Sequence, residues 1–281
     1  MLLEYIKAII YGIIEGISEW LPISSTGHLI LLEGLLTLDC AKQLGDSYRA
    51  MFDVVIQLGA VLAVLVIYWK NLYPFGKGKK GVLGLWGRLI LATIPAAVIG
   101  LLADKLCEHF LGCDLDGLLF TPQVVASALI IYGMVFILVE LLTKKCTQNS
   151  LPINARSAIA IGFFQALALV PGTSRSGATI LGARILGIDR KEATKFSFFA
   201  AIPVISAASL LKTAEFTKHI ASANSPLPLN ALLVLLVAGG VAFAVSMLTV
   251  NFLTDFVKKH TFIPFGIYRI ILGIAVLIFI K

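Results

Sequence analysis

The sequence has few charged residues: Asp, Glu, Lys and Arg together make up only 14% of its 281 residues. Soluble domains contain about 25% charged residues, whereas 58% of this chain is hydrophobic and its mean hydropathy is +0.94. No polar stretch is long enough to build a water-soluble domain. The scarcity of charge therefore excludes an ordinary soluble protein and indicates an integral membrane protein, embedded in the bilayer.

Cysteine is also scarce, and no cysteine forms a CxxC pair or has a histidine at ligand spacing, so a zinc site is not expected. The four cysteines are Cys40, Cys107, Cys113 and Cys146. Cys107 and Cys113 fall in one predicted loop. The sequence leaves open whether they form a disulfide or remain free thiols packed in the protein.

The formal net charge is +7, but the basic residues are not gathered into a patch suited to nucleic acid. They sit in short loops between apolar segments; Arg190 and Lys191 follow one segment, and Lys258 and Lys259 follow another. Lys and Arg in such loops stay on the cytoplasmic side of a membrane. If the apolar segments alternate in direction, the basic loops are cytoplasmic and both chain ends lie outside. We expect no nucleic-acid partner.

Two apolar segments, 3–36 and 155–187, are interrupted in the middle by proline and small polar residues. The first is broken around Pro22 and the second around Pro171. A membrane-spanning helix needs about 20 unbroken, mostly apolar residues, and each half-segment is shorter than that. We therefore predict two re-entrant helix–loop–helix hairpins, in which a hydroxyl caps the second helix after the proline break.

Six further segments are long and apolar enough to cross a membrane. They are 52–70, 86–104, 122–143, 192–212, 229–252 and 264–280. Phe52–Ala63 resembles Phe196–Ala207, and each follows a predicted hairpin. The sequence thus predicts an all-α membrane protein of six transmembrane helices plus two re-entrant hairpins. The order of hairpin, helix and helix recurs and predicts an inverted-topology repeat with halves of about 1–120 and 121–281, whose hairpin tips meet at one site.

The first hairpin carries acidic and nucleophilic side chains at its break. Glu15 and Glu19 are four residues apart, hence on one helical face. Two ionised carboxylates so placed repel each other, unless one is protonated or a divalent cation bridges them. Ser25 and His28 are candidates for a nucleophile and its base, whereas the other hydroxyls at the break are expected to cap the second helix.

The second hairpin carries a turn suited to phosphate. The stretch from Gly172 to Gly177 reads GTSRSG. Its glycines let backbone N–H groups approach an anion, its hydroxyls donate, and a helix start follows. Arg175 adds a fork that matches two phosphate oxygens. Carboxylates, a hydroxyl, an imidazole and an anion-binding turn at membrane depth together predict hydrolysis of a phosphorylated lipid.

Both interruptions resemble the signature motifs of the undecaprenyl-diphosphatase, or bacitracin-resistance, family. The first motif is E/Q-x-x-x-E followed by LPxSSTGH, and it is matched from Glu15 to His28. The second is PGxSRSxxT, matched from Pro171 to Thr179. The resemblance implies hydrolysis of undecaprenyl diphosphate to undecaprenyl phosphate and phosphate, which recycles the lipid carrier of cell-wall synthesis and confers bacitracin resistance. It also implies a Mg²⁺ or Ca²⁺ ion, a homodimer, and a site in the bacterial inner membrane that opens to the outer side.

Roles are assigned to the motif residues as hypotheses. Ser25 attacks the terminal phosphorus, and Glu19 or His28 takes its proton; His28 or water are alternative nucleophiles. Glu15 and Glu19 hold the cation. The diphosphate is bound by residues of the second motif, namely Gly172, Ser174, Arg175, Ser176 and Thr179.

The competing hypothesis is a transporter or flippase of undecaprenyl phosphate, because inverted repeats with broken helices also occur in transporters. Fold alone does not decide between the two. A carrier needs only the anion-binding turn, so the added carboxylates and the candidate nucleophile favour the enzyme.

Overall fold

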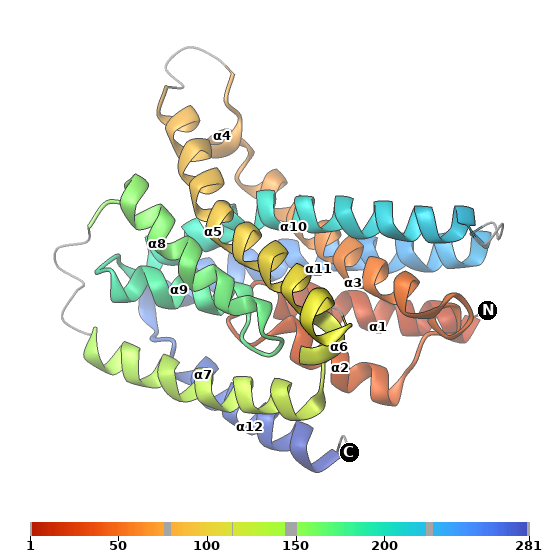
Figure 1. Ribbon diagram of the computed structural model, residues 1–281. Coiled ribbons are helices and arrows are strands. Elements are labelled where there is room, and N and C mark those ends of the chain that lie inside the picture. The colour runs from red at the N-terminus through yellow and green to blue at the C-terminus, as the bar shows by residue number, and fades with distance from the viewer. Residues whose placement is uncertain (1, 76–79, 114, 144–150, 223–226, 280–281) are drawn as a thin grey trace.

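The computed structural model describes residues 2–75, 80–113, 115–143, 151–222 and 227–279. These residues form a bundle of helices and contain no strand (Figure 1). The two chain ends lie on the same side of the bundle in this view. The all-α prediction is confirmed.

Both interrupted segments fold as helix, break and helix. The helices are α1 (Leu2–Ser18) and α2 (Ser25–Leu35) in the first, and α8 (Ala155–Ala166), the short 3-10 helix η2 (Leu167–Leu169) and α9 (Arg175–Ile185) in the second. The breaks fall at the proline-containing stretches, as predicted. In each segment the second helix begins within a few residues after the proline, because proline removes a backbone donor and the residues that follow can cap a new helix.

Among the described residues, five helices are long and apolar enough to cross a membrane. They are α3 (Asp39–Ile67), α5 (Lys80–Leu111), α7 (Pro122–Leu142), α10 (Arg190–Ser222) and α11 (Leu229–Lys259). The predicted sixth segment, α12 (Ile263–Phe279), is shorter, at 17 residues. Two short helices, α4 (Trp69–Leu72) and α6 (Leu115–Leu119), follow α3 and α5. The chain is therefore a multi-pass membrane protein.

Several long helices extend beyond the apolar segments that predicted them. Helix α3 begins at Asp39, well before Phe52, and bends at Gly45, whose φ is 76°. The added part is polar, so the apolar segment 52–70 predicted from hydropathy does not include it. A helix satisfies its own backbone hydrogen bonds both inside and outside the hydrocarbon. The part that lies outside can therefore consist of polar residues and still be helical.

The first helix of each interrupted segment packs on a long helix from the other end of the chain: α1 lies against α11, and α8 lies against α5. Small residues allow this close approach. Side chains at Gly12 and Gly16 of α1 would collide with the backbone of α11, and one at Gly162 of α8 would collide with α5. Such small-residue contacts are the usual way in which membrane helices approach closely.

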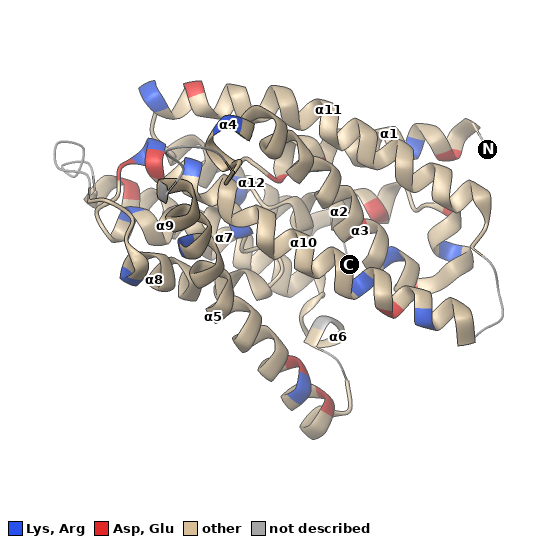
Figure 2. Ribbon diagram, turned by 90° about the horizontal axis from the view of Figure 1, so that it is seen from above, with Lys and Arg blue, Asp and Glu red and all other residues tan. Residues whose placement is uncertain are grey.

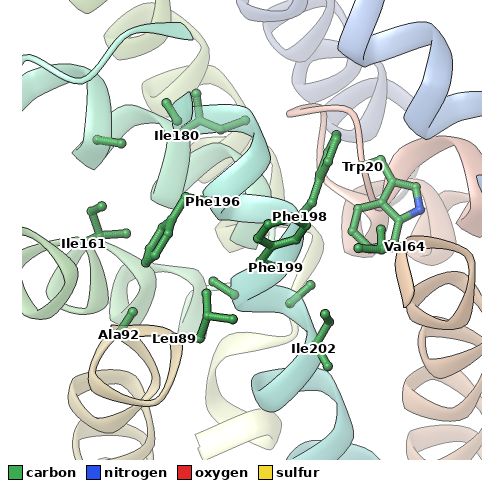
Figure 3. Close-up of a cluster of buried hydrophobic side chains, with 14 of the residues drawn as sticks. Trp20, Val64, Leu89, Ala92, Ile161, Ile180, Phe196, Phe198, Phe199 and Ile202 are labelled. Carbon is green, nitrogen blue, oxygen red and sulfur yellow. The ribbon is translucent and has the colours of Figure 1, made fainter. Parts of the chain in front are cut away.

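An apolar cluster around α10 joins the remaining elements. Figure 3 shows Trp20, from the break after α1, beside Phe198 of α10. Their rings meet edge to face at 5.3 Å between centroids. Ile161 of α8 and Leu89 of α5 belong to the same buried cluster. The first break is thus anchored in a core that the second interrupted segment shares.

Charged residues lie mostly toward the ends of the bundle, and the long helices between are largely uncharged (Figure 2). One buried network joins the base of the second hairpin to its neighbours: Glu140 of α7 pairs with Arg190 and lies 3.9 Å from the Nε atom of Arg184. Buried charges of this kind are stable only when they are paired.

Cys107 and Cys113 carry free thiols, as does Cys40. Cys107 lies within α5, which extends into the stretch that the sequence predicted as loop. Of the two options that the sequence left open, the structure has the free thiols. Cys146 lies outside the described residues.

We predict that Gly12→Ala lowers the melting temperature of the protein in detergent. Alanine favours a helix over glycine by about 1 kcal/mol, but its methyl group would meet the backbone of α11. Gly84→Ala in α5 is the matched control, because nothing lies within 4 Å of that position. Equal or higher melting temperatures for both variants would show that the α1–α11 contact tolerates a side chain.

Candidate functional site

The two breaks are closed by the same turn. Ser24 and Ser174 precede α2 and α9, with φ angles of 74° and 70°, and they are the two non-glycine residues with positive φ among the described residues. Each serine Oγ accepts a hydrogen bond from the backbone N–H of a glycine three residues later, Gly27 at 3.3 Å and Gly177 at 3.1 Å. A positive φ costs energy in a non-glycine residue, so these caps hold strained turns in place.

The two breaks meet at the carboxylate of Glu19. The Nη2 atom of Arg175 donates to Oε1 of Glu19 at 2.6 Å, and Oγ of Ser25 donates to Oε2 at 2.9 Å. A third contact, from Ser176 Oγ to the carbonyl of Leu21 at 3.3 Å, joins the same two loops. The structure therefore brings together the acid, the hydroxyl and the guanidinium that the sequence singled out separately.

Helix α10 holds the guanidinium of Arg175 from the other side. The Nη1 atom donates to the carbonyl of Ser197 at 2.7 Å, and the guanidinium lies 5.9 Å from the ring centroid of Trp20. Thr179 Oγ1 lies 2.7 Å from Ser197 Oγ and 3.0 Å from the backbone carbonyls of Arg175 and Ser176 in its own helix, and its single proton can go to one of these acceptors at a time. Thr179 thus supports α9 and its contact with α10 in this structure.

Glu15 is a buried carboxylate without a hydrogen-bond partner among the described residues. Its side chain is fully buried, and neither carboxylate oxygen has a hydrogen-bond partner among the described residues. It lies one helical turn before Glu19, whose N–H donates to its carbonyl at 3.0 Å. An unpartnered buried carboxylate is expensive, so Glu15 requires a proton or a cation.

Glu15 and Glu19 fit a divalent cation only in part. Two carboxylate side chains one turn apart suit a hard cation. However, no group of three or more His, Cys, Asp or Glu side chains is arranged to hold a metal ion in the part of the chain that the structure describes. Two carboxylates would hold such an ion together with oxygen atoms of a substrate or of water.

His28 is engaged at both ring nitrogens. Its Nδ1 atom lies 2.7 Å from the carbonyl of Ser24, which can only accept, so Nδ1 donates. Its Nε2 atom lies 2.7 Å from the hydroxyl of Tyr268, and the two rings stack at an angle of 8°. Within the described residues, Ser25 bonds to Glu19 and not to His28. Of the two bases that the sequence offered for Ser25, Glu19 is the one that the serine contacts in this structure.

Sequence reasoning missed two neighbouring residues of α12 that contact this site. Tyr268 bonds to His28, and Arg269 donates to the carbonyls of Pro22, Gly172 and Thr173. The available signal was the arginine itself, since a charged residue within an apolar helix marks a functional region. Nothing in the local sequence names its partners.

Residues 8–275 match the model of the family described as "Bacitracin resistance protein BacA". The chain belongs to this family. It is 43% identical to an undecaprenyl-diphosphatase of Enterococcus faecalis, with 98% of this chain and 97% of the relative aligned. It is 44% identical to one from Acetivibrio thermocellus (99% and 98% aligned) and 48% identical to one from Streptococcus mutans (98% and 96% aligned).

The family match includes most of α1, all helices from α2 to α11 and most of α12. The resemblance inferred from the two motifs is therefore confirmed over nearly the whole chain. The alignments extend over almost the full length of this chain and of these relatives.

Proposed function

We propose that the chain hydrolyses undecaprenyl diphosphate to undecaprenyl phosphate and inorganic phosphate in the bacterial cell membrane. This reaction would recycle the lipid carrier of cell-wall synthesis and confer resistance to bacitracin. Family membership and the names of the relatives support the proposal. The single structural observation that carries it is the contact of Ser25 and Arg175 with one carboxylate, Glu19.

Ser25 is the proposed nucleophile and Glu19 its base. The Ser25–Glu19 distance of 2.9 Å lies within the range for proton transfer to a general base. As Oγ attacks the terminal phosphorus, Glu19 takes the proton, the bond to the bridging oxygen breaks, and undecaprenyl phosphate leaves. Water then attacks the phosphoserine, releases inorganic phosphate and restores the serine. His28 is a weaker candidate nucleophile because both of its nitrogens are engaged.

The second hairpin is proposed to bind the diphosphate. Arg175 offers a planar fork for phosphate oxygens, and it already reaches the loop that carries Ser25. Gly172, Ser174, Ser176 and Thr179 surround it in sequence, with backbone N–H groups at the start of α9. A helix start and a guanidinium together favour a dense negative charge.

Glu15 and Glu19 are the proposed ligands of a divalent cation, Mg²⁺ or Ca²⁺. The two unpartnered oxygens of Glu15 support this assignment. A cation bound there would neutralise the carboxylates and part of the charge of the diphosphate. Glu19 would then both contact the cation and accept the proton of Ser25.

The proposed topology has six membrane-spanning helices and two hairpins that re-enter the membrane from opposite faces. Helix α12 completes the six, since about 17 residues suffice to cross a membrane. The packing supports an inverted repeat with halves of about 1–120 and 121–281. Helix α1 of the first half packs on α11 of the second half, and helix α8 of the second half packs on α5 of the first half. Both termini would lie outside the cell, the site would open to the outer side, and the protein would form a homodimer.

A carrier of undecaprenyl phosphate is the less favoured function. Transport would use the anion-binding loop but would not require a serine bonded to a buried carboxylate. Phosphate release by the purified protein in detergent, where no two sides exist, tests the enzyme directly.

We predict that Ser25→Ala and Glu19→Gln each reduce the kcat of phosphate release by about 10²–10⁴-fold, since each removes one member of a nucleophile–base pair. The double variant should lose little more than either single one, because the two residues act as a unit. Ser18→Ala is the control, as Ser18 is buried but bonds only to the carbonyl of Ile14. Near-normal turnover by Ser25→Ala would overturn the assignment of the nucleophile.

Arg175→Lys should lower kcat/KM for the diphosphate by about 10²-fold, because lysine keeps the charge but cannot reach Glu19, Ser197 and phosphate with one planar fork. Arg156→Lys, at an exposed position of α8, should leave kcat/KM unchanged. Steady-state kinetics of both variants in detergent check this. Equal values for Arg175→Lys and the wild type would show that charge alone suffices.

Divalent cations should raise the melting temperature of the wild-type protein relative to EDTA, because they relieve the buried carboxylate of Glu15. Glu15→Gln should be at least as stable as the wild type in EDTA and should lose most of the cation-dependent rise. Thermal unfolding in detergent, with Mg²⁺, Ca²⁺ or EDTA, measures both effects. An undiminished rise in Glu15→Gln would place the cation elsewhere.

A further inference from the structure

Arg269 in α12 is a buried cation that pairs with backbone instead of with an acid. Its side chain is 0% exposed. Nη1 donates to the carbonyl of Pro22 at 3.3 Å, and Nη2 donates to the carbonyls of Gly172 and Thr173, each at 2.8 Å. The first carbonyl belongs to the break of the first hairpin and the other two belong to the break of the second. One guanidinium therefore ties together the two loops.

These three carbonyls lie immediately before the reactive positions. Pro22 precedes Ser25 by three residues, and Thr173 precedes Arg175 by two. Both loops leave carbonyls without helical partners at the point where the chain turns, and such groups are costly inside a membrane protein. Arg269 satisfies three of them at once, and in doing so it sets the distance between the loops.

The site for this guanidinium is shaped by neighbouring glycine and aromatic residues. A side chain at Gly177 would lie 3.0 Å from Nη1 of Arg269. Gly133 of α7 and Gly266 of α12 bring these two helices so close that a side chain at either position would meet the other backbone. The rings of Tyr132 and Phe136 lie 5.9 and 5.8 Å from the guanidinium. A cation over aromatic rings gains stabilisation where carboxylates are absent.

We propose that Arg269 is a positioning residue for the hydrolytic reaction: it holds the two loops in the register that brings Ser25 and Arg175 to Glu19. It acts through the backbone and does not touch the substrate. The inference rests on the proposed function. Tyr268, the preceding residue, reaches His28 of the first hairpin from the same helix, so α12 determines the position of both hairpins.

Arg269→Lys is the first test. Lysine retains the positive charge but has one nitrogen, which cannot join carbonyls of both loops in the same planar geometry. A misplacement of reacting groups by about 1 Å can cost about 10²-fold in rate, so we expect kcat per folded protein to fall by about 10²-fold. Folded protein is measured as the monodisperse fraction with a normal melting transition.

Arg184→Lys is the matched control. Arg184 is equally buried, with 1% exposure, and also donates to backbone carbonyls, those of Ile188 and Thr143. It ties the base of the second hairpin, away from the two breaks. Its lysine variant should lose stability but keep the kcat of the folded fraction.

Arg269→Ala provides a readout that a role in stability alone would not change. Added methylguanidinium should restore about tenfold of the lost activity, because it can refill the site and rejoin the loops. The same compound should restore nothing in Arg184→Ala. Unchanged kcat in folded Arg269→Lys, or losses that follow the folded fraction as in Arg184→Lys, would overturn the inference. A wild-type protein that releases no phosphate would instead overturn the proposed function and this inference with it.

Discussion

Glu19 receives one hydrogen bond from each of two loops that lie far apart in the sequence, and the rest of the structure keeps those loops in place. Ser25 and Arg175 both donate to its carboxylate. Their carrier helices, α2 and α9, are short, and neither could hold its side chain in position by itself. Longer helices contact both loops. Helix α10 accepts a hydrogen bond from Arg175 and packs on Trp20, and α12 donates to the second loop through Arg269.

The hydrocarbon core of a membrane offers no hydrogen-bond partners, which explains why so many polar groups converge here. A chain that turns inside a membrane exposes backbone donors and acceptors that only protein can satisfy. In this protein the donors at the starts of α2 and α9 go to Ser24 and Ser174, and carbonyls in the loops go to Arg269. Groups that catalysis needs and groups that folding needs are therefore close neighbours. Glu15, whose oxygens have no partner among the described residues, is the exception that points to a ligand.

The sequence predicted the features that are local and left out those that depend on distant partners. Both breaks were visible because proline and hydroxyl residues interrupt apolar runs, and the meeting of the breaks followed from the cost of isolated polar groups in a membrane. The sequence left Glu19 and His28 open as the base of Ser25; it did not indicate that Tyr268 of α12 contacts His28 while Ser25 bonds to Glu19. The predicted segment 52–70 omits the polar start of α3 for a related reason: hydropathy reports lipid contact, whereas the backbone hydrogen bonds of a helix continue beyond its apolar part.

The two loops show how one turn serves two chemical roles. Each has a serine at positive φ, whose Oγ caps a glycine N–H three residues later. The residue directly after that serine begins the helix, and it is Ser25 in one loop and Arg175 in the other. The turn places this residue at the same local position in both loops, and in each loop its side chain donates to Glu19. A hydroxyl on one side and a guanidinium on the other converge on a single carboxylate, and the proposed attack on a bound phosphate rests on this contact.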